Sequence, residues 1–471
     1  MVKLNTKFNK ILAVMLSLLI IFAAFGNIIP YVVQAEEADS DVIVISSARE
    51  LIEFANNCKY DSYSRGRTVR LATDINLSNT DFNGIPYFDG TFDGANHTIR
   101  SFNVDYKGSD YGFFRYLGEN AYVCNFSVSG SVNTSGSQKN IGGIAGVNYG
   151  TITNCTFYGK VNGTTYVGAI AGINKPGANI TNCLSDAVVT ATNQTGGIAG
   201  KNEGLISECV SRSRVNTDEL ASSLDVGGVD VGTFNITQHV VDRNDMGGIA
   251  GNSSGVISSC TNYGTIGYNH TGYNVGGIAG SQNGKILNCT NEGDIYGRKD
   301  VGGIVGQVAT EYDFDPEDDI TLTGTESFDV EQTIKAVVRD SRNFGDITGK
   351  KDNVGGIVGK AEYGAIISCE SYAPIESTGG SDVGGIAGSA SYAIRSCYSM
   401  GRITGKNNIG GIAGEGCDIF YSYAYNDLDM SGENQGSIAG KVSDDGSLYG
   451  NYYVEGGVGG GDGIGFPGGG T

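Results

Sequence analysis

The densest group of residues that could bind a cation is an acidic run in the second half of the chain. Its six carboxylates fall within nine residues: Glu311, Asp313, Asp315, Glu317, Asp318 and Asp319. Because Ca²⁺ prefers carboxylate oxygens as ligands, the run is a candidate calcium or ligand-binding loop, with Asp313 and Asp315 as candidate metal ligands. The simpler interpretation is a solvated charged loop, and we favour it.

Two motif comparisons bear on the calcium hypothesis. The stretch from Asp313 to Glu317 resembles the start of an EF-hand loop only in part, because Asp318 stands where that loop needs glycine. In the tail, Asp462 lies in a glycine-rich stretch whose sequence resembles a single calcium-binding nonapeptide repeat. Such nonapeptides work in tandem, so one imperfect copy makes Asp462 a weak calcium candidate.

Catalytic motifs give no assignable site. The three histidines, His97, His239 and His270, do not form H-E-x-x-H, and no G-x-S-x-G turn is found. Asn216-Thr217-Asp218 resembles one piece of the polygalacturonase signature, and Asp318-Asp319 resembles another. The Gly-His-Gly and Arg-Ile-Lys pieces are missing, so we expect no enzyme and assign no catalytic residue.

The ten cysteines show a periodic arrangement. Seven recur at one position of a repeat: Cys155, Cys183, Cys209, Cys260, Cys289, Cys369 and Cys397. We expect a stack of buried thiols rather than disulfides, because parallel side chains strain the torsion that a bridge needs. Cys58 and Cys417 lie outside the stack. No C-x-x-C pair indicates a zinc or redox site.

The elements that must position these residues come from an internal repeat. Gly142-Gly143-Ile144-Ala145-Gly146 returns with few changes, and most copies begin 26 to 29 residues apart. The copies begin at Gly142, Gly168, Gly196, Gly247, Gly276, Gly302, Gly355, Gly384, Gly410 and Gly436. Two spacings are nearly doubled, which locates insertions at 215–245 and 308–340.

A second marker sets the frame between the glycine motifs. Ile152-Thr-Asn-Cys155 recurs with each stacked cysteine, and Val or Ile follows six residues later. Val338 with Ser341 and Ile419 with Ser422 fit the same frame without cysteine, and Ala121 with Cys124 fits loosely. The marker therefore counts ten coils.

The repeat predicts an all-β fold, a right-handed parallel β-helix of about ten or more coils. Its units are rich in Gly, Asn, Thr, Val and Ile, which suit turns and short strands. Ile152 and Cys155 both look like core positions although they are three apart, so a bend is expected at Thr153-Asn154. A second corner is expected at the Gly-Gly pair, which gives roughly three strands per coil. A β-propeller needs longer units.

The repeat resembles a known family. The glycine motifs, with the lead-in from Asn288 to Ile295, resemble the GLUG motif repeats of bacterial secreted proteins, and the segments Val69–Leu77 and Gly90–Ile99 are similar to the coils that usually precede them. The resemblance covers most of the chain from Asp41 to Tyr453 and implies a β-helical secreted or surface protein. Similar repeats occur upstream of the zinc domain in bacterial immunoglobulin A peptidases. The motif carries no catalytic residues.

The chain divides into four expected regions. Residues 1–35 have the layout of a signal peptide cleaved after Ala35, with a membrane anchor as the alternative. Residues 36–120 are expected to form a capping region with the first coils, including a short helix at Ala48–Asn57. Residues 121–455 form the solenoid, whose insertions are expected as binding loops on one face. Residues 456–471 read as a flexible glycine-rich tail.

Composition limits the partners. The net charge of −20 argues against nucleic acid and anionic membranes, and no second spanning stretch follows the signal segment. The chain has no Trp, but 26 Tyr could replace it in a sugar-stacking site. We expect a secreted or surface module that binds extracellular polymers or host proteins, without a cofactor unless calcium. The alternatives are the non-catalytic N-terminal part of a larger secreted peptidase, or a polysaccharide lyase or glycosidase.

Overall fold

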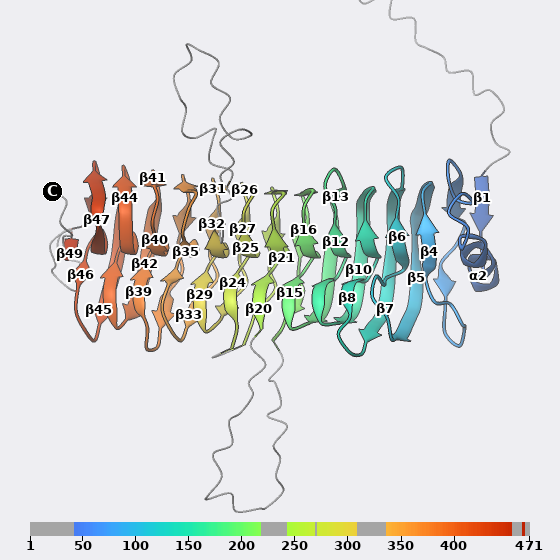
Figure 1. Cartoon of the computed structure of the whole chain (residues 1–471), viewed down its shortest axis with the longest axis horizontal. Helices are drawn as coiled ribbons and strands as arrows, with labels where there is room; N and C mark the ends of the chain where they lie inside the picture. The colour runs from blue at the N-terminus through green and yellow to red at the C-terminus, as the bar shows by residue number, and fades with distance from the viewer. Residues whose placement is uncertain (1–41, 218–242, 269–270, 309–335, 455–463, 467–471) are drawn as a thin grey trace, which may run out of the picture. The chain divides into compact units, whose positions relative to one another are not determined.

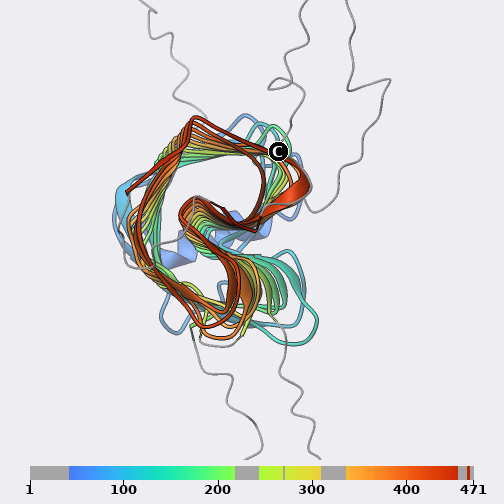
Figure 2. The ribbon, with the colours of Figure 1, turned by 90° about the vertical axis from the view of Figure 1, so that its left-hand side faces the viewer.

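Equivalent residues of successive repeats pair in parallel and stack the chain coil upon coil (Figure 1). The structure is a computed structural model that describes residues 42–217, 243–268, 271–308, 336–454 and 464–466. Ile152 pairs with Ile180, and Ile180 pairs with Ile206. Viewed along the stack, the coils overlie one another (Figure 2). The predicted parallel β-solenoid is confirmed.

One stack of strands follows the glycine motifs and runs through thirteen coils. Its members begin at or near the Ala of the repeat, with the first two before the first glycine motif. They are β4 (Ile85–Phe88), β6 (Phe114–Leu117), β9 (Ala145–Asn148), β12 (Ala171–Asn174), β16 (Ala199–Asn202), β21 (Ala250–Ser253), β25 (Ala279–Gln282), β30 (Val305–Val308), β35 (Val358–Ala361), β40 (Ala387–Ala390), β44 (Ala413–Phe420), β47 (Ala439–Tyr449) and β49 (Ile464–Phe466).

The strands that end on the first glycine of each motif form a separate ten-stranded sheet. They are β8 (Lys139–Gly142), β11 (Thr165–Gly168), β15 (Asn193–Gly196), β20 (Asn244–Gly247), β24 (Tyr273–Gly276), β29 (Lys299–Gly302), β34 (Val354–Gly355), β39 (Ser381–Gly384), β43 (Asn407–Gly410) and β46 (Gln435–Gly436).

A third stack carries the Ile that precedes each cysteine. It contains β2 (Thr68–Leu71), β5 (Thr91–Tyr106), β7 (Tyr122–Thr134), β10 (Thr151–Asn162), β13 (Asn179–Thr181), β17 (Leu205–Ser207), β22 (Val256–Ser258), β26 (Lys285–Leu287), β31 (Val337–Arg339), β36 (Ala365–Ile367) and β41 (Ile394–Arg395), and it continues into β44 and β47.

The strands after the cysteine position complete each coil. Besides the second halves of β5, β7 and β10, they are β3 (Ile75–Asn76), β14 (Leu184–Thr190), β18 (Val210–Ser211), β19 (Arg214–Val215), β23 (Thr261–Asn262), β27 (Thr290–Asn291), β28 (Ile295–Tyr296), β32 (Arg342–Asn343), β33 (Ile347–Gly349), β37 (Glu370–Ser371), β38 (Ile375–Ser377), β42 (Tyr398–Gly405), β45 (Tyr423–Met430) and β48 (Tyr452–Tyr453). β1 (Val42–Ile45) precedes the coils. The expected three strands per coil was wrong, because the coil from β25 to β29 has five short strands.

The register confirms most of the sequence frame. Ile286 pairs with Val338, and Ile394 pairs with Ile419, so both coils without cysteine are placed correctly. The loose assignment of Ala121 and Cys124 was wrong. Val123 pairs with Ile152, and Phe126 pairs with Cys155, so phenylalanine takes the cysteine position in this coil and Cys124 pairs with Thr153.

The predicted bend before each cysteine is confirmed. Asn154 has φ 51°, in the left-handed region that asparagine tolerates. The same position is left-handed in the other coils, at Asn125, Asn182, Glu208, Ser259, Asn288, Asp340, Ser368, Ser396 and Tyr421. A second left-handed position was missed, two residues before the first glycine of each motif: Asn140, Tyr166, Gln194, Asp245, Asn274, Asp300, Asn353, Asp382, Asn408 and Asn434.

The glycine motif is required by close approach of backbones. Strand β24 ends at Gly276 and β25 begins at Ala279, so the chain turns there as expected. A Cβ on Gly280 would stand 2.3 Å from the backbone nitrogen of Met246 in the preceding coil. A Cβ on Gly276 would stand 2.1 Å from the Ala279 carbonyl oxygen. Only glycine lets the coils stack here.

The expected helix is confirmed as α2 (Ala48–Asn57). The Ser47 hydroxyl caps it by accepting a hydrogen bond from the backbone N–H of Glu50. Its apolar side buries Leu51 and Phe54, and the Phe54 ring lies 6.2 Å from that of Phe88 in β4. The helix therefore covers the core of the first coil with apolar side chains.

The two insertions leave the coil at different corners, which corrects the expectation of a single loop face. The first follows β19 and returns at β20, between the strands after the cysteine and the ten-stranded sheet. The second follows β30 and returns at β31, between the strand after the glycine motif and the strand that carries the Ile.

Candidate binding face

All residues proposed as metal ligands or as the acidic binding loop lie outside the described residues: Asp313, Asp315, Glu317, Asp318, Asp319 and Asp462. Asp218, His239 and His270, which were weighed for catalytic motifs, also lie outside them. His97 is described, and its Nδ1 lies 3.3 Å from Oδ1 of Asp74 in a surface ion-pair cluster with Arg100. In the described ranges, no group of three or more His, Cys, Asp or Glu side chains could hold a metal ion.

The structure places the seven periodic cysteines at equivalent buried positions, and all ten cysteines are free thiols. Each of the seven sulfurs lies near the carbonyl oxygen two residues earlier, as in Cys209 Sγ to Ser207 O at 3.2 Å. Ser341 takes the same position, and its hydroxyl donates to the Arg339 carbonyl at 2.9 Å. Burial raises the pKa of Cys209 and Cys289 well above its ordinary value. These thiols line the core and not a reactive site.

The candidate functional site is the sheet surface that follows the cysteine stack. Strand alternation turns the cysteine and the second residue after it inward, and the first, third and fifth residues after it outward. We call this surface, with its three outward columns, the post-cysteine face. Because every coil contributes to the same columns, their side chains lie about 4.8 Å apart along the stack.

Aromatic side chains occupy this face in the C-terminal coils. Phe344 stacks on Tyr372 with centroids 5.0 Å apart and an interplanar angle of 5°. Tyr398 stacks on Tyr423 at 5.6 Å, also at 5°. Tyr372 and Tyr398 are tilted, at 5.7 Å, so the four rings continue across four coils. With two more exposed tyrosines they form the aromatic row: Phe344, Tyr372, Tyr398, Tyr423, Tyr425 and Tyr452.

Polar contacts hold the first part of the aromatic row. The Tyr372 hydroxyl donates to Oε2 of Glu370 at 2.6 Å, and this bond raises the pKa of Tyr372 to about 12. Arg342 Nε donates to the same carboxylate at 2.9 Å. The phenol therefore stays neutral at physiological pH. Phe344 is 48% exposed, Tyr372 and Tyr398 are half-buried, and the exposed fraction then rises from 38% at Tyr423 to 67% at Tyr452.

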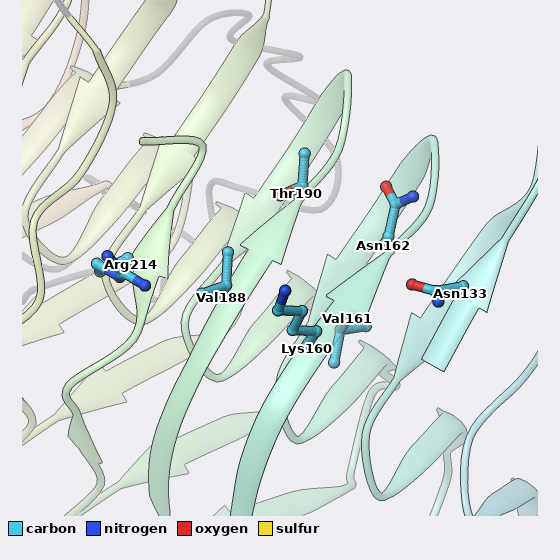
Figure 3. A pocket seen from close by; sticks show the side chains of 7 residues that line it. All are labelled: Asn133, Lys160, Val161, Asn162, Val188, Thr190 and Arg214. Atoms are coloured by element: carbon cyan, nitrogen blue, oxygen red, sulfur yellow. The ribbon is translucent and has the colours of Figure 1, made fainter. Parts of the chain in front are cut away.

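The N-terminal half of the same face also has an exposed tyrosine, Tyr158, but its main feature is a basic cavity. A cavity of about 320 Å³ opens between β7, β10, β14 and β19 (Figure 3). Its lining includes two basic side chains, amides and a hydroxyl: Asn133, Lys160, Val161, Asn162, Val188, Thr190 and Arg214. Lys160 and Arg214 are the fifth residues after Cys155 and Cys209, so both belong to one outward column.

Both features were missed from the sequence, although a signal was present. Tyr398, Tyr423 and Tyr425 stand one or three residues after the cysteine position, and Lys160 and Arg214 stand five residues after it. Reading the outward columns in the repeat frame would have found them. The candidate residues in the two insertions lie outside the described part of the chain.

Three comparisons place the chain among known proteins. The GLUG motif model matches residues 137–162 and 271–296. Halomucin from Haloquadratum walsbyi (strain DSM 16790 / HBSQ001) is 34% identical over 86 residues, which is 18% of this chain and 1% of that protein. A crystal structure of a candidate immunoglobulin A1 protease from Bacteroides ovatus has a TM-score of 0.36 and 20% identity, covering 71% of this chain and 76% of that one.

The family match and the fold agree. Each matched stretch runs from the strand that ends on the first glycine of the motif, β8 or β24, to the strands after the cysteine. Strand β24 pairs with β20 and with β29 in the same register. No helix in the described part of the chain is long and apolar enough to cross a membrane. The chain is thus a parallel β-solenoid that carries GLUG-motif repeats.

Proposed function

We propose that this protein is a secreted or cell-surface binding module without catalytic activity, which holds an extended neutral glycan along the aromatic row. The observation that carries the proposal is the continuity of aromatic rings over adjacent coils, of which Tyr372 and Tyr398 are half-buried and the other four are exposed. Single exposed aromatics are ordinary on protein surfaces, whereas a contiguous patch marks an interaction site.

The chemistry of the row favours a glycan. Tyrosine combines apolar ring surface with a hydroxyl that can donate and accept hydrogen bonds, which suits the mixed apolar and hydroxyl surface of a sugar. Each of five successive coils carries at least one ring, and β45 carries two, so a polymer of repeating units that lies along the stack meets a similar side chain at each step.

The charges near the row favour a neutral polymer. Asp427 is exposed on the same strand as Tyr425, and Glu376 is exposed two coils before it, whereas Asp429 pairs with Arg402. With a chain net charge of −20, Asp427 and Glu376 disfavour a polyanion. The secreted location rests on the signal-like N-terminus and on the extracellular character expected of GLUG repeat proteins. Among the described residues, no structural observation favours the peptidase-associated or lyase alternatives.

The test is the affinity of the purified protein for soluble neutral glucans, xylans and chitin oligomers, measured by isothermal titration. The double variant Y423A/Y425A removes two exposed rings and should weaken binding about tenfold or more. The variant Y423F/Y425F keeps the rings and should retain most of the affinity. Tyr60→Ala removes a ring that is 74% exposed in the capping region and serves as control. Equal loss in Y60A and Y423A/Y425A would contradict the proposal.

A further inference from the structure

The cavity on the N-terminal half of the post-cysteine face is built by the register of four strands. Lys160 pairs with Val188, and Val188 pairs with Arg214. The two basic residues therefore flank a valine at a separation of roughly 10 Å between Cα atoms, two strand spacings. Figure 3 shows these three side chains on neighbouring strands.

A second column supplies uncharged donors to the same cavity. Asn133 pairs with Asn162, and Asn162 pairs with Thr190. This column lies two residues beyond Lys160 on the same strands, so the amides and the hydroxyl border the basic column. An amide N–H₂, a hydroxyl, a guanidinium and an ammonium are all hydrogen-bond donors.

The cations of the cavity are available to a ligand. Lys160 and Arg214 are exposed, and neither forms an ion pair with any acidic residue in the described part of the chain. By contrast, Lys175, Lys201, Arg342 and Lys441 each pair with a glutamate. Two exposed acids border the cavity: Asp186 on the adjacent outward column, where Arg212 follows it, and Asp105, which pairs with Asn133. The cavity is thus locally positive on a chain of net charge −20.

We propose that this cavity binds the anionic group, a carboxylate or a sulfate, of an acidic extracellular polysaccharide. The planar guanidinium of Arg214 fits two oxygens of such a group, and Lys160 supplies a second positive charge. Asn162 and Thr190 donate to the remaining oxygens or to neighbouring sugar hydroxyls. Val188, which is half-buried between the two cations, offers an apolar floor to the sugar ring.

This site is independent of the aromatic row. The cavity lies on the coils before Val215, and the aromatic row begins at Phe344. The cavity is proposed to bind an acidic polymer and the aromatic row a neutral one. Either proposal can therefore be wrong while the other is right. The variants that test one leave the other unchanged.

The experiment measures binding of the purified full chain to polygalacturonate, dextran sulfate and neutral dextran at low ionic strength. Lys160→Gln with Arg214→Gln should weaken binding of the acidic polymer by about tenfold or more, as expected for lost charge-assisted hydrogen bonds. The control double variant K285Q/K351Q removes two positive charges from exposed lysines elsewhere on the solenoid and should change the affinity less than about twofold. Added salt should weaken binding of the unsubstituted protein.

The two acidic polymers distinguish a carboxylate ligand from a sulfate ligand. Binding of polygalacturonate alone assigns a carboxylate, and binding of dextran sulfate alone assigns a sulfate ester. Failure to bind either polymer, equal losses in both double variants, or equal affinity for neutral dextran would overturn the proposal. Stronger binding to a short DNA duplex would also overturn it, because the ligand would then be a phosphate backbone.

Discussion

One backbone angle decides how each coil turns into the cysteine stack. Asn182 has φ 49°, and its side chain is exposed. A β-branched residue in this conformation costs about 1–2 kcal/mol, whereas glycine adopts it freely. We expect Asn182→Val to lower the unfolding temperature and Asn182→Gly to leave it nearly unchanged. Thermal unfolding followed by circular dichroism checks this, and equal effects of both variants would show that the angle is not the cause.

A second residue at a left-handed corner links stability to pH. Asp300 is buried, and burial raises its pKa above the ordinary value of 3.8, although Asn353 Nδ2 donates to its carboxylate at 2.5 Å. The folded protein therefore holds this proton at a pH where the unfolded chain has lost it. The stability that this group contributes is full at pH values below 3.8 and is lost as pH rises through the raised pKa.

The substitution Asp300→Asn introduces asparagine, the residue type that the neighbouring coils have at this position, at Asn274 and Asn353. The variant should unfold at a higher temperature than the unsubstituted protein at pH 7, and the difference should shrink at pH 4. Calorimetry at the two pH values checks it. A variant less stable at pH 7 would mean that the carboxylate stabilises the corner, contrary to the account.

At the scale of the element, the glycine motif sets how closely coils can stack. The third glycine is present in all ten copies, whereas the second position also accepts Ala169 and Ser437. Gly280→Ala would place a Cβ 2.3 Å from the Met246 nitrogen and should cost about 3 kcal/mol or more by overpacking. Gly379→Ala is the control, because its Cβ would meet no atom closer than 3.5 Å. Equal melting temperatures for the two variants would contradict the close-approach argument.

The cysteine stack predicts a thiol count. All ten cysteines should react with a thiol reagent after denaturation without reductant. In the native protein the stacked thiols should react slowly, because burial both shields the sulfurs and raises the pKa of residues such as Cys209. If the denatured protein had no free thiols, the cysteines would be paired in disulfides and the stack of free thiols would be wrong.

The sequence predicted the elements where a repeated side chain faces the core. The Ile–Cys frame placed even Val338 and Ile419 in the correct register, because a buried column tolerates few residue types. It failed at Cys124, because Phe126 takes the cysteine position in that coil, and at Asp300, where the left-handed residue varies among Asn, Asp, Gln and Tyr. Strand number was underestimated because left-handed residues and bends divide each coil into shorter strands than apolar segments suggest.

At the scale of the whole molecule, stacking converts a position in the repeat into a column on the surface. Each coil contacts its neighbours, so one substitution pattern over several coils makes an extended face without changing the fold. The aromatic row and the basic cavity share the post-cysteine face in this way. The outward columns vary from coil to coil, so their role could not be read from the repeat itself. The calcium hypothesis for Asp313 to Asp319 and Asp462 remains a prediction, since those residues lie outside the described part of the chain.

The central claim is that the solenoid binds an extracellular polymer and does not cleave it. The most direct measurement applies the purified protein to an array of neutral and acidic glycans and assays released sugars in the same wells. We expect the protein to be retained on at least one neutral glycan, the Y423A/Y425A variant not to be retained, and no reducing or unsaturated sugar to be released. Release of such sugars, or the absence of any binding, would contradict it.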